Sequence, residues 1–127
     1  MIYLQVLPDT FFLYQLRLDE TIPQSVFALS FYSVTKTSDE ISIITNSFIE
    51  MPSAKINDGW KGLRVKGELD FSLIGIINKI TKPLKENNIS VFVTSTYNTD
   101  YVFVRKEYLE KTIEVLNNTP EISASNM

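Results

Sequence analysis

A short polar stretch before residue 101 carries side chains that can hold a small polar ligand. Ser95 and Thr96 offer hydroxyl groups, Asn98 offers an amide, and Asp100 offers a carboxylate. A carboxylate accepts hydrogen bonds from a cationic group, and hydroxyls and amides can add further hydrogen bonds around it. These four residues are therefore candidate binding residues. A simpler interpretation stays open, because Asp, Asn and Thr are also ordinary turn residues.

A second group of candidates lies where a predicted strand leads into a predicted helix. A helix N-terminus presents free N–H groups and a favourable dipole to an anion. The residues concerned are Phe71, Ser72, Leu73, Gly75 and Ile76. Gly75 can let a ligand or a partner backbone approach closely, although it can equally serve close helix packing. Asp70 is most simply a helix cap, and a cap competes with an incoming carboxylate for the same donors.

Several catalytic chemistries are excluded by composition. The 127 residues contain no Cys and no His, so disulfides, thiolate nucleophiles, Cys/His zinc sites and Ser-His-Asp triads cannot be built. The acidic pairs Asp19-Glu20 and Asp39-Glu40 are adjacent on predicted loops, where neighbouring side chains diverge. There is also no Gly-rich phosphate loop. We therefore expect no enzyme activity, no metal and no cofactor.

Charge and hydropathy disfavour several classes of binding partner. The formal net charge is -3, which disfavours binding to nucleic acids through phosphate contacts and docking on anionic membranes. The most apolar stretch, residues 71–80, is too short and too polar to cross a bilayer. No signal peptide is readable at the N-terminus, so we expect a cytoplasmic protein. Apolar residues make up 44% of the chain, enough for an independent core.

The second half of the chain has the clearer pattern of elements. Leu63 and Val65 alternate with basic residues as in a half-buried strand. An amphipathic helix is predicted from the spacing of Leu73, Ile76, Ile77, Ile80 and Leu84. Pro83 predicts a kink or an early end of this helix, and Asn87-Asn88 a stop. Two strands follow at 89–97 and 101–105, and a helix is predicted over 107–117.

The first half predicts a strand over 11–18, a short helix over 24–29 and a hairpin from 31–36 and 41–45. The stretch 51–59 has the composition of a loop and marks the one internal boundary. Residues 119–127 are polar and lack periodicity, which predicts a flexible tail. Strand, helix, strand, strand in each half is the start of a ferredoxin-like βαββαβ unit. The predicted fold class is α+β, with antiparallel sheets and helices packed on one face.

The whole chain except its tail resembles small bacterial proteins with tandem ACT domains. These are relatives of the aspartate kinase regulatory region and, more distantly, of animal arginine sensors. The stretches that carry the resemblance are Asp58-Gly59-Trp60, Leu63–Ser72 (LRVKGELDFS), Gly75-Ile76, Pro83-Leu84, Asn88-Ile89-Ser90 and Ser95–Tyr101 (STYNTDY), with Phe31–Thr35 and Asp39–Ile43 upstream. The resemblance implies an N-terminal ACT-like subdomain over 1–58 and a C-terminal ACT domain over 59–118.

The resemblance also implies a regulatory module that binds a small ligand, a free amino acid, and that pairs with a second copy. The candidate residues then divide by role: helix N–H groups for the ligand carboxylate, and Asp100 for its ammonium. A rival interpretation is an interaction module without a ligand, using an exposed sheet edge and the aromatics Phe92, Tyr97, Tyr101 and Phe103. RNA binding through Phe92 and Phe103 is disfavoured by the acidic charge. Trp60 is most simply a core or interface anchor.

Overall fold

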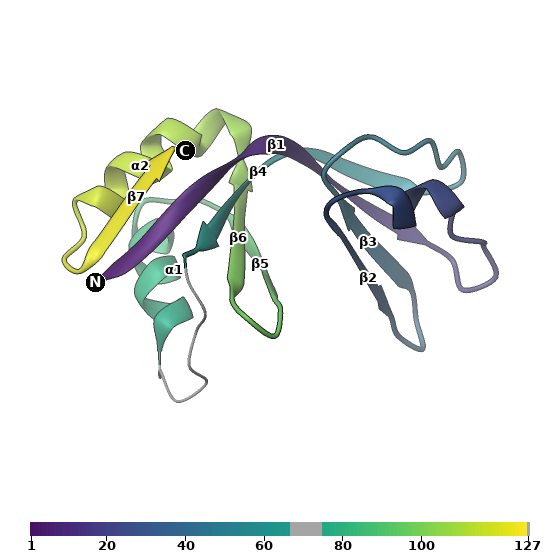
Figure 1. The fold of residues 1–127 in the computed structure, drawn as a ribbon, viewed down its shortest axis with the longest axis horizontal. Coiled ribbons are helices and arrows are strands. Elements are labelled where there is room, and N and C mark those ends of the chain that lie inside the picture. Colours follow the sequence, from purple (N-terminus) through teal and green to yellow (C-terminus); the bar gives the residue numbers. More distant parts are fainter. Residues whose placement is uncertain (67–74, 127) are drawn as a thin grey trace. The chain divides into compact units, whose positions relative to one another are not determined.

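The computed structural model describes residues 1–66 and 75–126 (Figure 1). Their elements are, in order, β1 (Ile2–Leu16), the 3₁₀ helix η1 (Gln24–Ala28), β2 (Tyr32–Lys36), β3 (Ile41–Thr45), β4 (Lys55–Val65), α1 (Ile76–Glu86), β5 (Val91–Ser95), β6 (Asp100–Arg105), the 3₁₀ helix η2 (Lys106–Tyr108), α2 (Leu109–Asn117) and β7 (Ile122–Asn126). The predicted α+β class is confirmed. No helix of this described part is long and apolar enough to cross a membrane.

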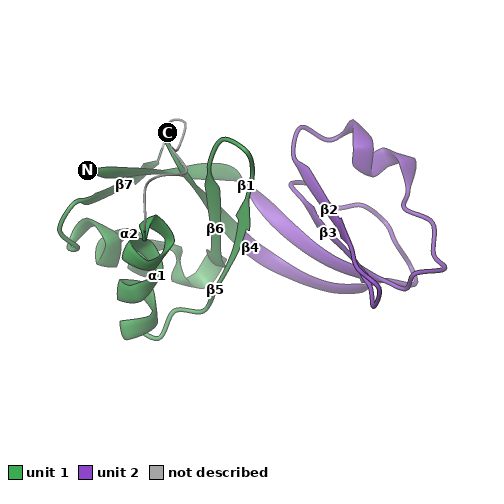
Figure 2. Cartoon of the chain, turned by 90° about the horizontal axis from the view of Figure 1, so that it is seen from below, with its two compact units in different colours: residues 1–8, 61–127 green, residues 9–60 purple. Residues whose placement is uncertain are grey.

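The chain divides into two compact units, which Figure 2 colours separately. Unit 1 consists of residues 1–8 and 61–127, and unit 2 of residues 9–60. The long strands β1 and β4 each contribute one end to unit 1 and the other to unit 2. This division differs from a simple split after residue 58, because the first eight residues belong with the C-terminal half.

Unit 1 is a sheet with two α-helices packed against it. Its strands follow the order β7-β1-β4-β6-β5. Alternate residues of the strands, such as Leu4, Leu63 and Val102, point into one core together with Ile80 and Leu84 of α1. Both α1 residues are 0% exposed, as the apolar spacing of this helix predicts.

Helix α1 ends at a turn formed by the asparagines that follow it. Pro83 lies inside the helix, which continues to Glu86. Of the two predicted alternatives, an early end at Pro83 is wrong, and a kink stays a prediction. The predicted stop at Asn87-Asn88 is confirmed. Asn88 has a left-handed backbone with φ 59°, and the N–H of Ile89 donates to the carbonyl of Leu84 at 2.9 Å. A left-handed residue directly after the helix returns the chain to its last carbonyls.

The predicted flexible tail is wrong over residues 122–126, because they form strand β7. Ile122 and Ala124 are 5% and 4% exposed and lie opposite Ile2 and Leu4 in a parallel pairing with β1. The sheet is therefore not purely antiparallel as predicted. The side chain of Asn117 holds the strand, accepting from the N–H of Ala124 at 2.7 Å and donating to its carbonyl at 2.9 Å.

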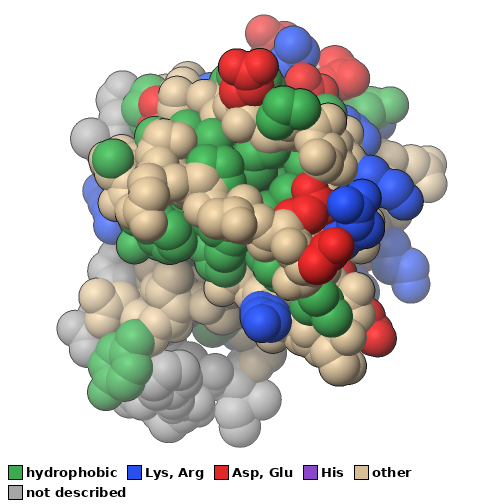
Figure 3. Space-filling view, turned by 90° about the vertical axis from the view of Figure 1, so that its right-hand side faces the viewer, with side chains coloured by type: hydrophobic (Ala, Val, Ile, Leu, Met, Phe, Trp, Pro, Cys, Tyr) green, Lys and Arg blue, Asp and Glu red, His purple; other side chains and the backbone are tan. Residues whose placement is uncertain are grey.

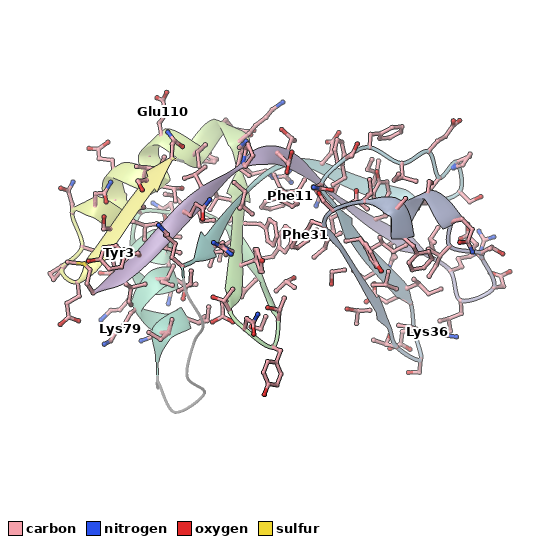
Figure 4. The ribbon with its side chains drawn as sticks, viewed as in Figure 1. Tyr3, Phe11, Phe31, Lys36, Lys79 and Glu110 are labelled. Carbon is pink, nitrogen blue, oxygen red and sulfur yellow. The ribbon has the colours of Figure 1, made fainter. Side chains whose placement is uncertain are left out.

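Unit 2 has a sheet of order β2-β3-β1-β4 and one short 3₁₀ helix, η1. Tyr14 pairs with Ile43 and both belong to its core, together with Val26 of η1. Phe11 and Phe31 meet edge to face, with ring centroids 5.3 Å apart (Figure 4). No α-helix occurs in residues 9–60, so this unit lacks the two packed helices of a full ferredoxin-like domain. The predicted loop 51–59 ends early, because β4 already begins at Lys55.

Candidate functional site

The candidates between β4 and α1 divide into described and undescribed residues. Phe71, Ser72 and Leu73 lie outside the described residues, as do Asp70 and its predicted capping role. The helix itself begins at Ile76 after Gly75, without a side-chain cap at that position. In any α-helix the N–H groups of the first turn lack an intrahelical acceptor, which makes those of this turn candidate donors to a ligand.

Gly75 is needed for its backbone conformation. Its φ is +79°, a region that residues with a Cβ adopt only at a cost. A Cβ at this position would meet no described atom within 4 Å, so close packing against the described part of the chain does not explain the glycine. The next residue, Ile76, packs its side chain against the core of unit 1. This side chain is only partly buried, so Ile76 can offer a ligand its backbone N–H and an apolar contact.

The candidates near residue 100 come together in the hairpin between β5 and β6. Ser95 and Asp100 are opposite each other in the strand register, and the Ser95 hydroxyl donates a hydrogen bond to the Asp100 carboxylate. Asp100 is half-buried and Ser95 is exposed. A carboxylate offers about four acceptor positions, so one bond from Ser95 leaves capacity for a cationic ligand group.

The turn of this hairpin is closed by threonines. The N–H of Thr96 donates to the carbonyl of Thr99 at 2.8 Å, and the N–H of Thr99 donates to the Thr96 hydroxyl at 3.3 Å. These turn bonds belong to Thr96 and Thr99, and ordinary turn chemistry stays the alternative for Asp100. Asn98 is exposed at the tip of the turn and has no described side-chain hydrogen bond.

Thr99 anchors the hairpin that carries the candidate residues, and sequence reasoning missed this anchor. It is 6% exposed, and its hydroxyl donates to the carbonyl of Val65 at 2.7 Å. Val65 is the last residue of β4, directly before the connection to α1. Thr99 thus fixes the hairpin against the start of that connection. Nothing in the sequence separates this threonine from its neighbours Thr94 and Thr96.

The two groups of candidates are only partly brought together. Thr99 joins the hairpin to the end of β4, but no described hydrogen bond or ion pair joins Gly75 or Ile76 to the hairpin. A cavity of about 490 Å³ beside α1 and β5 is lined by none of the predicted site residues.

The aromatic residues of the rival interpretations are less available than predicted. Phe103 is 0% exposed, and its ring stacks on Phe92 with centroids 4.6 Å apart. Tyr97, at 79% exposure, does lie at the surface. Phe103 therefore has no exposed ring face on which an RNA base could stack, and this burial adds to the charge argument against RNA binding.

Comparison with known proteins identifies the family. A model of the ACT domain matches residues 55–118. Protein Atu0741 from Agrobacterium tumefaciens has a solved structure with a TM-score of 0.89 at 31% identity, covering 99% of this chain and 93% of that chain. The regulatory subunit of aspartate kinase from Thermus thermophilus, in its ligand-free form, has a TM-score of 0.63 at 11% identity. The alignment covers 89% of this chain and 94% of the subunit, and it shows a shared fold alone.

One curated protein with a similar sequence is named as an amino-acid sensor. The mouse protein named cytosolic arginine sensor for mTORC1 subunit 1 is 28% identical over 111 residues, which cover 81% of this chain and 33% of the mouse protein. The chain spans about half or less of the curated relatives that it matches. The ACT match covers half of the chain, and Atu0741 is similar over nearly its full length. The chain therefore belongs to the ACT-domain family.

Proposed function

We propose that this chain is a cytoplasmic, non-enzymatic regulatory module that binds a free amino acid. The family match and the names of two similar proteins, an arginine sensor and a regulatory subunit of aspartate kinase, support this class of function. The absence of His and Cys from the sequence agrees with a role that needs no nucleophile.

The Ser95–Asp100 pair is the observation that carries the proposal. A free amino acid needs a carboxylate or carbonyl oxygens for its ammonium group and N–H donors for its carboxylate. Asp100 supplies the first, with Ser95, Thr96 and Asn98 around it. The first turn of α1, after Gly75, supplies the second, and Phe71, Ser72 and Leu73 are proposed to extend that row of donors.

We also propose that both halves are ACT-like, a subdomain over 1–58 and a domain over 59–118. The order strand, helix, strand, strand occurs in each, with η1 in unit 2 standing where α1 stands in unit 1. In unit 2 the second helix is replaced by an irregular segment between β3 and β4. Unit 2 would then be a reduced ACT fold whose sheet is thinly covered.

A second copy of the chain is the proposed partner of unit 2. Strand β2 is an edge of the sheet order, and an unpaired edge offers backbone donors and acceptors. Tyr32 of β2 and Phe27 of η1 are 42% and 44% exposed, with ring centroids 5.4 Å apart. The face of unit 2 in Figure 3 shows hydrophobic side chains at its centre and charged ones at its margin. Exposed aromatics beside an open edge favour pairing with another copy.

A thermal-shift screen against the standard amino acids tests ligand binding. A ligand present at about one hundred times its dissociation constant adds about 2.7 kcal/mol of stability, which raises the melting temperature by several degrees. A selective shift by one or two amino acids is the expected result. A flat response to all of them would favour the second candidate function, an interaction module without a ligand.

Asp100→Ala tests the site. This substitution should abolish the ligand-induced shift and leave the melting of the free protein nearly unchanged, because the bond lost to Ser95 lies at the surface. Asp100→Asn keeps an acceptor for Ser95 and removes the charge, so it should lose the shift as well. The matched control is Glu110→Ala, which removes an exposed carboxylate from α2 (Figure 4). Normal binding by Asp100→Ala would remove this residue from the site.

A further inference from the structure

One edge of the unit 1 sheet is protected and the other is open. At β7, the side chain of Asn117 occupies both the N–H and the carbonyl of Ala124. At the opposite end of the order lies β5, and no described strand pairs with its outer edge. An open edge can accept another extended chain through backbone hydrogen bonds.

A basic groove lies along α1 and reaches the first residue of this strand. The cavity of about 490 Å³ is lined by Asn78, Thr81, Lys82 and Lys85 of α1, by Ile89 in the connection to β5, and by Val91, where β5 begins. Ile89 is 4% exposed and gives the groove an apolar floor, whereas both lysines are exposed on its helical wall. The groove therefore combines strand edge, apolar floor and positive charge.

The two lysines have no carboxylate partner in the part of the chain that the structure describes. Lys79, one turn earlier, lies 3.8 Å from Glu121, but neither Lys82 nor Lys85 takes part in a described ion pair. Lys85 also lies near the C-terminal end of α1, where a cation is favoured by the helix dipole. The helix dipole accounts for a lysine at position 85. It does not account for two lysines beside an open strand edge.

We propose that the β5 edge and this groove dock an extended acidic segment of a partner protein. In such a complex the segment adds a strand to β5, and alternate side chains point to the α1 side, about 6.7 Å apart. Acidic residues at these positions reach Lys82 and Lys85. The proposal does not depend on amino-acid binding at the hairpin, and it concerns a different surface.

The same charges argue against a second copy as the occupant. If β5 paired with β5 of another copy around a two-fold axis, the same surface of each would face the other. Lys82 and Lys85 would then approach the same lysines of the partner helix without neutralisation. Like charges in close contact oppose association, whereas an acidic strand is attracted.

Fluorescence anisotropy with a synthetic peptide tests the proposal. The probe is a labelled eight-residue peptide of alternating Val and Glu, measured against the full chain at low salt. We expect saturable binding, and at least a tenfold loss of affinity for Lys82→Glu/Lys85→Glu. The matched control, Lys36→Glu/Lys55→Glu, changes the net charge equally on exposed residues of unit 2 and should bind within about twofold of the wild type. Circular dichroism of each variant verifies folding.

Two further peptides separate strand addition from charge attraction. Alternating Pro and Glu has the same charge but lacks half of the amide donors, and should bind at least tenfold more weakly. Alternating Val and Lys should not bind. The proposal is overturned if the Pro-Glu peptide binds as well as the Val-Glu peptide, or if Lys82→Glu/Lys85→Glu leaves affinity unchanged. It is also overturned if the wild type forms a dimer that this double variant dissociates, because a second copy would then occupy the edge.

Discussion

Unit 1 and unit 2 share two strands but cover their sheets differently. Two α-helices cover one face of the unit 1 sheet. Among the described residues of this unit, the exposed large hydrophobic ones are Met1 and three tyrosines, whose hydroxyls suit a surface. Unit 2 has only η1, and it exposes Leu18, Phe27, Tyr32, Phe48 and Ile56. A sheet face that lacks helices leaves apolar surface at the solvent. The difference supports the two proposals, polar recognition by unit 1 and self-association through unit 2.

The largest loss of stability is expected from substitutions in the cores of the two units. Leu84→Ala in unit 1 removes a side chain that is 0% exposed and packed between α1 and the sheet, so it should lower the free energy of unfolding by about 2–5 kcal/mol. Leu16→Ala in unit 2, at 3% exposure, should cost about 2 kcal/mol, because a thinly covered core can relax around the cavity. Urea unfolding measures both. An equal or larger loss for Leu16→Ala would contradict the comparison.

The second prediction concerns self-association. Tyr32→Glu places a charge at the β2 edge beside Phe27 and should weaken the dimer at least tenfold, as light scattering after gel filtration would show. Tyr97→Glu is the control, because Tyr97 is the more exposed tyrosine, at 79%, but belongs to unit 1. A wild-type protein that stays monomeric at its highest soluble concentration would refute the pairing. Dissociation by Tyr97→Glu would move the interface to unit 1.

Local patterns predicted those elements whose partners are close in sequence. The hairpins 32–36 with 41–45 and 91–95 with 100–105 occur close to the predicted positions, and α1 and α2 follow the apolar spacing. Strand β7 escaped prediction because it is short and polar except for Ile122 and Ala124. Its partner is β1, at the other end of the chain. Only that long-range pairing explains why these residues form a strand.

The candidate site residues were likewise predicted where their partners are close in sequence and missed where they are distant. Ser95 and Asp100 were predicted together and lie across one hairpin, five residues apart in sequence. Gly75 was predicted beside the helix and precedes it directly. Thr99 was missed because its partner, Val65, is 34 residues away. A hydroxyl that bonds a distant carbonyl leaves no local pattern in the sequence.

Thr99→Val should cause the smallest loss of stability among these variants, and it tests whether the hairpin of unit 1 depends on its anchor to β4. The valine keeps the shape and loses the bond to Val65, so we expect a loss of about 1 kcal/mol in unfolding free energy. Thr45→Val in unit 2 is a close match, since Thr45 is 0% exposed and donates to the carbonyl of Ser47 at 2.7 Å. Both should lose similar stability in urea.

The two threonine variants should differ in ligand response. Thr99 fixes the hairpin that carries Asp100, so Thr99→Val should reduce the amino-acid-induced thermal shift, whereas Thr45→Val should retain it. If both variants retain the full shift, the anchoring of the hairpin to β4 does not position the site. If both lose it, the site depends on unit 2 as well, and the assignment of polar recognition to unit 1 fails.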